Sequence, residues 1–213
     1  MISKTDDLRI INTQELVSPQ EIIDSISPSE RGFATIIKAR NQIKNILNKS
    51  DNKFMIVVGP CSIHDVEAAK EYATRLKNLS SSLSANCLIV MRVYFEKPRT
   101  VIGWKGLIND PDLDGSFKIN KGIRIARKLL IDLAEMEIPC GHEFLDLVSP
   151  QYVSDLISWG AIGARTTESQ VHRQIVSGLS MPVGFKNGTG GSIDIALDGI
   201  ISSKNPHCFM GIT

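Results

Sequence analysis

The sequence predicts an α/β fold built on a parallel sheet, and two observations carry that prediction. From Phe54 onward, short apolar runs rich in β-formers alternate with stretches that have helical spacing, which is typical of successive βα units. The last apolar run ends at Thr213, where an open doubly wound sheet would usually continue into a covering helix. This favours an incomplete (β/α)8 TIM barrel with six of its eight strands, and an open sheet is the alternative.

The predicted elements follow from apolar spacing. Positions Val66, Ala69, Ala73 and Leu76 are spaced as on one face of a helix, and so are Ile123, Ala126, Leu130 and Leu133. Three shorter helices are expected over 150–159, 168–178 and 192–202, the second with Thr166 or Thr167 as N-cap and Gly178 near its end. The expected strands are 54–58, 87–95, 139–147, 161–166, 182–186 and 207–213.

The chain divides at residue 53. Residues 1–53 carry mixed charge and the turn signals Ser18-Pro19 and Ser27-Pro28, and they end in apolar positions with helical spacing at Ile36, Ala39 and Ile43. We interpret them as an N-terminal arm and helix that serves oligomer contacts or regulation. Residues 54–213 form the predicted catalytic barrel domain.

Composition excludes several functional classes. Twenty-four Lys and Arg residues against 23 Asp and Glu leave a net charge of +1, which argues against a nucleic-acid partner. No apolar run approaches the roughly 20 residues that span a bilayer. The first 20 residues lack the apolar stretch of a signal peptide and the four cysteines show no CxxC spacing. We expect a cytoplasmic protein with reduced thiols, of which Cys87, Cys140 and Cys208 lie in strands and belong to the core.

Cations gather at the predicted carboxyl ends of the strands, where parallel α/β folds place their functional groups. The set is Arg92, Lys97, Arg99, Arg165 and Lys186. Arginine binds phosphate and carboxylate bidentately, and lysine supplies a point charge. The sequence therefore predicts a pocket for several anionic groups, against the alternative of solvated strand ends.

Three further features have weaker signals. Glu143 ends the third predicted strand, where a carboxylate beside cations handles a proton or orders a water, or forms a structural ion pair. Cys61 follows the first strand with His64 three residues on; it is a candidate metal ligand or a buried inert thiol, and His64 could cap the next helix. The glycine-rich stretch 186–191 could offer N–H groups to a phosphate, but no Walker A or GxGxxG motif is present, so no nucleotide cofactor is expected.

Six sequence strings together resemble class I 3-deoxy-D-arabino-heptulosonate 7-phosphate (DAHP) synthases: GPCSIHD, MRVYFEKPRT, GWKGLINDP, EFLD, WGAIGARTTESQ and PVGFKNGT. The resemblance begins in the arm at Asp6 and reaches the end of the chain. It implies a (β/α)8 barrel with an N-terminal extension. It also implies the family reaction, in which phosphoenolpyruvate condenses with D-erythrose 4-phosphate and water and phosphate is released, the first step of the shikimate pathway to aromatic amino acids.

The resemblance implies a role for each matching position. The residues expected to bind phosphoenolpyruvate are Arg92, Lys97, Arg165 and Lys186, with Gly163 and Ala164 lining its phosphate. The residues expected to receive erythrose 4-phosphate are Lys97, Arg99 and Thr100. The expected catalytic residues are Lys97, Glu143 and Lys186, with Glu143 near the reacting enol carbon and its water.

The resemblance also implies a divalent metal of the Mn, Fe, Co or Zn class that polarises the acceptor aldehyde, with Cys61 as one ligand. The other ligands of the family are a His, a Glu and an Asp from beyond the sixth strand, so none of His64, His142, His172 and His207 is assigned. We therefore expect a shortened chain. One alternative is an inactive remnant that retains phosphate binding or subunit interaction; the related 3-deoxy-octulosonate 8-phosphate synthases are another, disfavoured by GWKGLINDP and KPRT.

Feedback control is the last implication of the resemblance. Regulated members bind an aromatic amino acid between one subunit and the arm of a neighbour, which implies a homo-oligomer. The matching positions are Asp6, Asp7, Pro150, Gln151, Leu179, Ser180 and Phe209. Ser180 favours phenylalanine over tyrosine as inhibitor, and packing at a subunit interface is the alternative role of this set.

Overall fold

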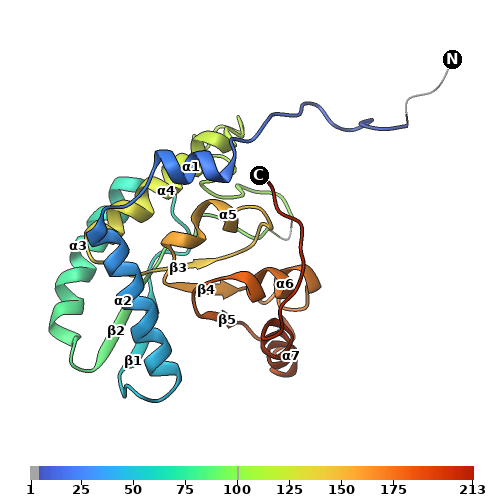
Figure 1. The fold of residues 1–213 in the computed structure, drawn as a ribbon. Helices are drawn as coiled ribbons and strands as arrows, with labels where there is room; N and C mark the ends of the chain where they lie inside the picture. Colours follow the sequence, from blue (N-terminus) through green and yellow to red (C-terminus); the bar gives the residue numbers. More distant parts are fainter. Residues whose placement is uncertain (1–4, 100) are drawn as a thin grey trace.

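A computed structural model of the chain describes residues 5–99 and 101–213. Its centre is a curled sheet of five parallel strands in the order β1-β2-β3-β4-β5 (Figure 1). The strands are β1 (Phe54–Val58), β2 (Cys87–Arg92), β3 (Cys140–Glu143), β4 (Trp159–Ile162) and β5 (Val183–Phe185). Each strand pairs with its neighbour in the chain, so the sheet has the strand order of a TIM barrel that is open on one side.

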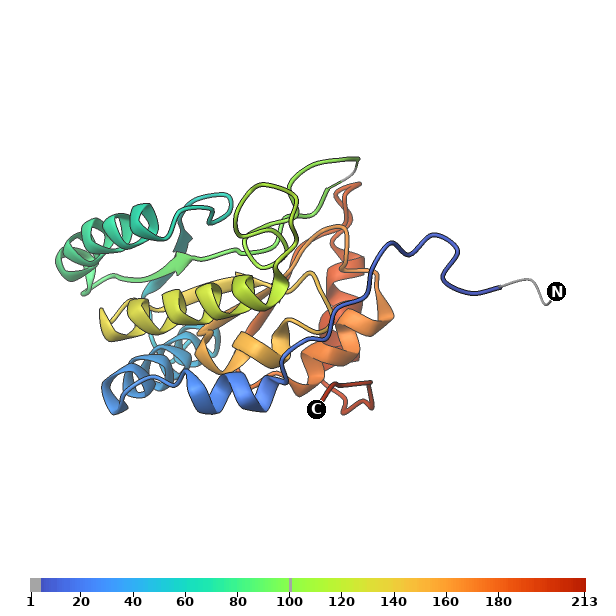
Figure 2. The same ribbon diagram turned by 90° about the horizontal axis from the view of Figure 1, so that it is seen from above.

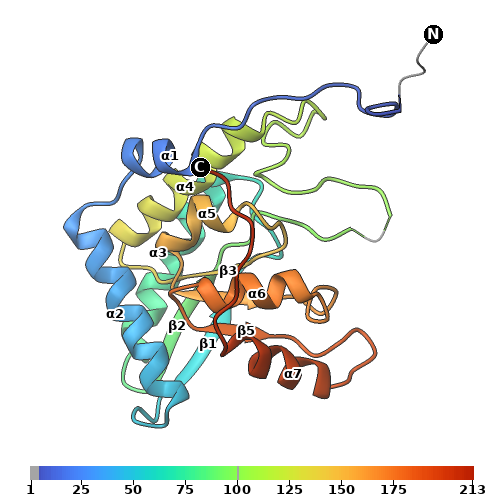
Figure 3. The ribbon, with the colours of Figure 1, turned by 45° about the vertical axis from the view of Figure 1, so that its right-hand side comes forward.

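The prediction of a sixth strand over 207–213 is wrong. These residues form an extended tail that runs past α6 and ends near α5 (Figure 3). The Phe209 ring covers Gly178, where an added Cβ would lie 3.0 Å from its Cζ, and Ile212 N donates to Gln151 Oε1 at 3.1 Å. Cys208 is exposed. The contacts of the tail are with helices, so it is not a strand and its cysteine is not in the core.

Seven α-helices and one 3-10 turn accompany the described strands. They are α1 (Pro19–Ser25), α2 (Glu30–Leu47), α3 (Val66–Leu83), α4 (Ile119–Glu135), α5 (Pro150–Val153), η1 (Ser154–Leu156), α6 (Gln170–Gly178) and α7 (Asp194–Ser203). The arm therefore contains two helices instead of the single one predicted, because Ser18 and Ser29 each cap a separate helix start.

Two of the predicted helix boundaries move. The helix expected over 150–159 stops at Val153, and Trp159 begins strand β4. The residue that precedes α6 is Ser169, and the Thr167 hydroxyl, instead of capping the helix, lies within hydrogen-bond distance of the carbonyl oxygens of Gly163 and Lys186. Asp65, not His64, caps α3 by accepting from Ala68 N at 3.0 Å.

The main core lies between the convex face of the sheet and the helices that follow the strands. Helix α4 buries the predicted positions Ile123, Ala126, Leu130 and Leu133. Burial of such side chains contributes about 25 cal/mol per Å² of apolar surface removed from water. The strand positions that face these helices include Ile89 and Met91, so odd-numbered residues of β2 point outward.

Helix α2 closes the concave face at the amino-terminal end of the strands. Its Ile43 packs against Leu88 and Val90 of β2, with Met55 and Trp159 at the margin of this small cluster. Even-numbered residues of β2 therefore point inward, and the next of them is Arg92. Because α2 occupies one end of this face, the inward-pointing side chains at the other end are left for a functional site.

Both outer strands are open on one side in the part of the chain that is described. Strand β1 pairs with β2 alone and β5 with β4 alone. Phe54 is 74% exposed, as expected for an apolar strand with one free edge. The first described residues of the arm extend away from the barrel (Figure 2), whereas Glu15 and Val17, just before α1, are hydrogen-bonded to Asn120. Among the described residues, no helix is long and apolar enough to cross a membrane.

Candidate functional site

The carboxyl ends of the strands surround a cavity of about 210 Å³. Side chains from every strand end or the loop after it reach the cavity, which fits the barrel rule for functional groups. The lining residues are Cys61, Arg92, Tyr94, Glu96, Lys97, Pro98, Glu143, Leu145, Ala164, Arg165, Thr166 and Lys186. The structure thus brings together four of the five predicted cations, the predicted carboxylate and the predicted thiol.

Close backbone approach lets the loop after β1 reach this cavity. A Cβ on Gly59 would lie 2.7 Å from the carbonyl oxygen of Arg92, so only glycine allows the two strand ends to come so near. The carbonyl oxygen of Cys61 then accepts a hydrogen bond from the Arg92 guanidinium at 3.3 Å. The site therefore depends on Gly59, which begins the string GPCSIHD that also contains Cys61.

The Lys97 ammonium donates a hydrogen bond to the Cys61 sulfur. This bond lowers the pKa of the Cys61 thiol; burial opposes the shift, and the positive charges of Lys97, Arg92 and Arg99 lower the pKa further. A lowered pKa raises the thiolate fraction, and the thiolate is the nucleophilic and metal-binding form. Cys61 is exposed rather than a buried inert residue.

Arg92 lies over an aromatic ring that the sequence analysis missed. Its guanidinium carbon is 3.7 Å from the centroid of the Tyr94 ring, within cation–π range. Burial, with help from the Glu143 charge, raises the pKa of Tyr94, although Arg92 opposes this. The Nε of Arg92 is buried and has no hydrogen-bond partner among the described residues. The guanidinium of Arg92 is therefore held in place by the Tyr94 ring at the wall of the cavity.

Glu143 is buried at the end of β3, and its position requires a glycine opposite. A Cβ on Gly163 would lie 1.9 Å from Glu143 Oε1, a distance that no side chain could tolerate. Gly163 follows β4, so it leaves room for the carboxylate between two neighbouring strand ends. The carboxylate is thereby placed at the cavity beside the cations.

A single threonine ties the last two strand ends together. The Thr167 hydroxyl lies 3.0 Å from the carbonyl oxygen of Gly163 and 2.7 Å from that of Lys186, and Lys186 N donates to Ile162 O at 3.0 Å. Thr167 is fully buried. These bonds fix the backbone that carries Ala164, Arg165 and Lys186 at the cavity.

Arg99 lies outside the cavity wall. Its Nε donates to the Trp104 carbonyl at 2.9 Å, which turns the guanidinium toward the loop that follows β2. It lines a wider hollow next to the cavity together with Lys97 and Arg165. Thr100 lies outside the described residues. Of the predicted pair Arg99 and Thr100, the structure therefore locates only Arg99, which lies beside the cavity.

Glu96 is a second carboxylate at the cavity that the sequence analysis missed. It is 3% exposed and accepts hydrogen bonds from Leu145 N and Asp146 N, both at 3.3 Å, and from the Ser149 hydroxyl at 3.0 Å. Its position directly before Lys97 in the string EKPRT was the available signal. Because it faces N–H and O–H donors, Glu96 holds the loop after β3 rather than adding a charge partner for the cations.

The metal-ligating residues present do not make a complete site. Among residues 5–99 and 101–213, no three His, Cys, Asp or Glu side chains lie together in a way that could hold a metal ion. His142 and His172 are buried and bond to main-chain carbonyls, those of Val93 and Leu145. Cys61 is the single predicted ligand at the cavity, and one thiolate does not satisfy a divalent transition metal.

The glycine-rich loop after β5 uses its own N–H groups. Gly188 N donates to Ser192 O at 3.0 Å and Gly191 N donates to Gly188 O at 2.9 Å. The loop thus closes on itself, and these two amides are not available to a phosphate. Of this stretch, only Lys186 reaches the cavity.

The residues predicted to bind an inhibitor fall into two groups. Leu179 and Ser180 follow the end of α6, and Pro150 and Gln151 begin α5; the tail brings Phe209 and Ile212 to these helices. Asp6 and Asp7 lie exposed in the extended arm. The structure thus gathers the first group at one side of the barrel, and the arm of the same chain extends away from it (Figure 2).

Comparison with known proteins gives consistent matches. A sequence model described as the DAHP synthetase I family matches residues 29–213. The Phe-sensitive phospho-2-dehydro-3-deoxyheptonate aldolase of Escherichia coli is 56% identical over 210 residues, which are 99% of this chain and 60% of the relative. The Trp-sensitive enzyme of Escherichia coli is 52% identical over 210 residues, which are 98% of this chain and 60% of the relative.

A solved structure agrees with the sequence matches. The phospho-2-dehydro-3-deoxyheptonate aldolase from Francisella tularensis superimposes with a TM-score of 0.92 at 54% identity and covers 94% of this chain and 59% of that chain. The chain thus spans about 60% of the length of the relatives that it matches.

Proposed function

Because the chain belongs to the DAHP synthetase I family, we propose that it takes part in the condensation of phosphoenolpyruvate with erythrose 4-phosphate in the shikimate pathway. Its relatives are named as phospho-2-dehydro-3-deoxyheptonate aldolases. The observation that carries the proposal is the cavity at the strand ends, where four cations meet two buried carboxylates, Glu143 and the hydrogen-bonded Glu96. Such a set suits a small substrate with several negative charges.

Phosphoenolpyruvate matches the charge of this cavity. It carries a carboxylate and a phosphate, and Arg92, Lys97, Arg165 and Lys186 line the space that would hold them. We propose that Ala164 and Gly163 lie along the phosphate, because the loop that carries them is fixed by Thr167. A fixed cluster of cations offsets the repulsion between two phosphorylated substrates and holds them in register.

Glu143 is the proposed proton-handling group. Water adds to C2 of the enol while C3 forms a bond to the aldehyde carbon, whose oxygen takes up a proton and becomes a hydroxyl. The hydroxyl at C2 then loses its proton as the bond from C2 to the phosphate oxygen breaks, which leaves a ketone and free phosphate. The water must lose a proton in this sequence, and the buried Glu143 carboxylate stands beside the phosphate-binding loop. Lys97, which lines both the cavity and the neighbouring hollow, is the proposed contact between the two substrates.

The metal of the family enters this proposal only through Cys61. A divalent ion would supply a Lewis acid at the acceptor aldehyde, and the described residues bring no three ligands together for it. No step is therefore assigned to a metal here. A second candidate function is a domain that binds phosphoenolpyruvate without turnover, which the cation-lined cavity would support by itself.

We also propose control by an aromatic amino acid in a homo-oligomer. The support is the Phe-sensitive and Trp-sensitive names of the relatives, together with the contacts of the tail, in which Phe209 covers Gly178 and Ile212 bonds to Gln151. Asp6 and Asp7 would then act from a neighbouring subunit. The cytoplasmic location stays a prediction from the sequence.

Binding and turnover are tested separately. Phosphoenolpyruvate is titrated into the chain by calorimetry, and phosphate release is measured with added divalent metal, with and without erythrose 4-phosphate. We expect binding that Arg165→Ala weakens by at least about tenfold, the loss of one charge-assisted contact. Lys204→Ala, at the exposed end of α7, is the matched control. Release that requires both the acceptor and metal supports catalysis, and binding without release supports the second candidate. The absence of phosphoenolpyruvate binding would contradict both.

A further inference from the structure

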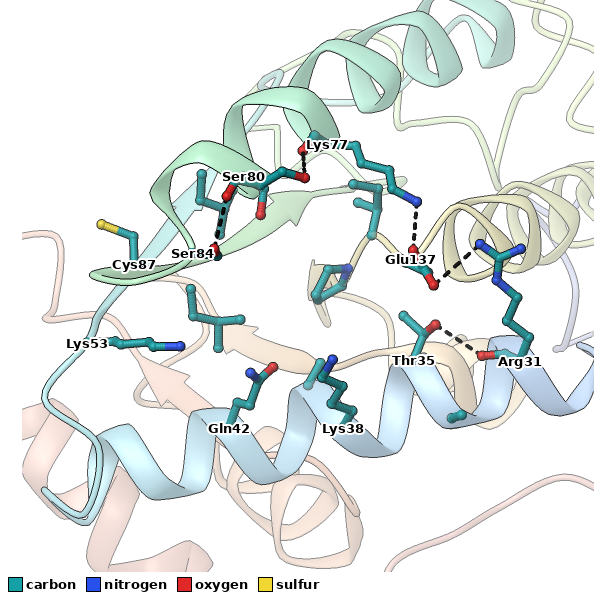
Figure 4. Close-up of a pocket in the computed structure, with 17 residues that line it drawn as sticks. Arg31, Thr35, Lys38, Gln42, Lys53, Lys77, Ser80, Ser84, Cys87 and Glu137 are labelled. Atoms are coloured by element: carbon teal, nitrogen blue, oxygen red, sulfur yellow. Dashed lines mark hydrogen bonds and ion pairs between the residues drawn. The ribbon is translucent and has the colours of Figure 1, made fainter.

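A second cavity, of about 390 Å³, lies at the opposite end of the barrel from the strand-end site. It opens between α2, α3 and the amino-terminal ends of β2 and β3 (Figure 4). The polar residues that line it are Arg31, Thr35, Lys38, Gln42, Lys53, Lys77, Ser80, Ser81, Ser84 and Glu137. Its volume is in the range of small-molecule sites, about 300–1,000 Å³.

Four cations line this cavity against one carboxylate, and that carboxylate is already neutralised. Glu137 lies 2.7 Å from the Lys77 ammonium and 3.4 Å from the Arg31 guanidinium. This cluster forms one wall of the cavity (Figure 4). The carboxylate therefore cannot balance the two remaining lysines.

Lys38 and Lys53 are those remaining cations. Within residues 5–99 and 101–213, neither side-chain amine has an ion pair or a hydrogen bond to protein. Lys38 lies on α2 one turn before Gln42, so the two side chains share a face. Lys53 comes from the segment before β1, where its main-chain N donates to Asp51 Oδ1 at 3.0 Å. Figure 4 shows all three side chains along one side of the cavity.

The opposite wall and the floor complete the site. Ser80 of α3 faces the cavity, and its hydroxyl has no hydrogen bond to protein in the described parts of the chain. The floor is apolar, formed by the buried residues Ala39, Leu88, Ile89 and Ile138. The cavity thus combines two unpaired ammonium groups, an amide and a hydroxyl with a hydrophobic base.

We propose that this cavity binds a small phosphate monoester with a compact apolar body, the phosphate between Lys38 and Lys53 and the apolar body on the floor. A phosphate dianion accepts from the two lysines and from Gln42, which lie along the same side of the cavity (Figure 4), and its charge offsets the repulsion between the two ammonium groups. The site is separate from the strand-end cavity, which shares no lining residue with it. It does not depend on the proposed function.

The proposal is tested with phenyl phosphate, which carries both chemical parts. Amide chemical shifts of the labelled chain are followed during titration, so that binding at residues 35–42 and 53 is separated from binding at 92–97. We expect shifts at the first set and an affinity that falls at least about tenfold in the Lys38→Gln, Lys53→Gln double variant. The matched control is Lys44→Gln with Lys204→Gln, which removes the same charge outside the cavity.

Each part of the ligand has its own comparison. Inorganic phosphate without the ring and benzyl alcohol without the phosphate should each bind more weakly than phenyl phosphate. The proposal is overturned by shifts confined to 92–97, by equal affinity in the two double variants, or by benzyl alcohol binding as well as phenyl phosphate. The shift map of the unaltered chain decides the matter even if a variant folds poorly.

Discussion

The Ser149 hydroxyl donates to the Glu96 carboxylate at 3.0 Å, a bond between residues that are 53 positions apart. Glu96 directly precedes Lys97 at the strand-end cavity, and Ser149 directly precedes α5. The bond therefore joins the loop of the candidate site to the helix that begins with Pro150 and Gln151. A movement of α5 would therefore be transmitted to Lys97 through the bond from Ser149 to Glu96 and the adjoining backbone.

Glu96→Gln tests that carboxylate. The amide nitrogen of glutamine would face a donor, either Asp146 N or the pair Leu145 N and Ser149 Oγ. A buried donor left unpaired costs about 1–3 kcal/mol, and we expect a loss of that size in urea unfolding. Ser149→Ala removes one donor only and should cost less. A Glu96→Gln variant as stable as Ser149→Ala would contradict the proposed role of the second oxygen.

Lys97→Met should make the Cys61 thiol less reactive. Loss of the hydrogen bond and positive charge moves the pKa of Cys61 up toward its ordinary value, so the thiolate fraction near neutral pH falls about tenfold for each pKa unit recovered. Alkylation by iodoacetamide, followed peptide by peptide, should slow at neutral pH and converge with the unaltered chain at high pH. Exposed Cys208 is the internal reference. An unchanged pH profile for Cys61 would refute the Lys97 contact.

Gly163→Ala should disrupt the site through Glu143. The added Cβ would lie 1.9 Å from Glu143 Oε1, and such overpacking costs about 1–3 kcal/mol of stability. In the Glu143→Ala background the carboxylate is gone, so the same change at 163 should cost much less. Unfolding of the four chains forms a double-mutant cycle, and simple additivity would show that the two residues do not compete for space.

Arg127→Met should destabilise the chain more than the other changes. Arg127 is fully buried, and it makes two hydrogen bonds to the Asp155 carboxylate at 2.7 and 2.8 Å and one to Ile26 O at 2.7 Å. Breaking such a pair from one side costs about 3–5 kcal/mol. Because Asp155 is partly exposed, the loss should lie toward the lower value. Lys128→Met, whose ion pair is on the surface, is the control and should stay within about 1 kcal/mol.

Periodic spacing was sufficient to predict the buried faces of α3 and α4 and the presence of the first five strands, although the strand ends and the first helix of the arm were not predicted. The buried face of α3 is the predicted set Ala69, Ala73 and Leu76, because a 3.6-residue repeat determines which side of a helix can pack. The strand-end cations converge for a similar reason, since parallel strands finish at one edge. Both predictions follow from local spacing or from strand topology, so they need no knowledge of contacts between distant residues.

The failures depend on contacts between distant parts of the chain. The apolar run around Phe209 has strand-like composition, and its course is set by the surface of α6 at Gly178. Glu96 was not singled out from the sequence, and it is buried because Leu145 and Asp146 supply N–H donors from 49 and 50 residues away. Composition cannot reveal either partner.

The sheet order β1-β2-β3-β4-β5 has a consequence for how the protein is made. Each of β2 to β5 pairs with the strand synthesised just before it. The edge to which a new strand adds has therefore already left the ribosome when that strand emerges. Assembly can therefore proceed in the direction of translation, without waiting for a distant partner. Strand β1, with Phe54 largely exposed, keeps its outer edge open while β2 to β5 are added, so that edge of the nascent chain is open to incorrect pairing during this stage of synthesis.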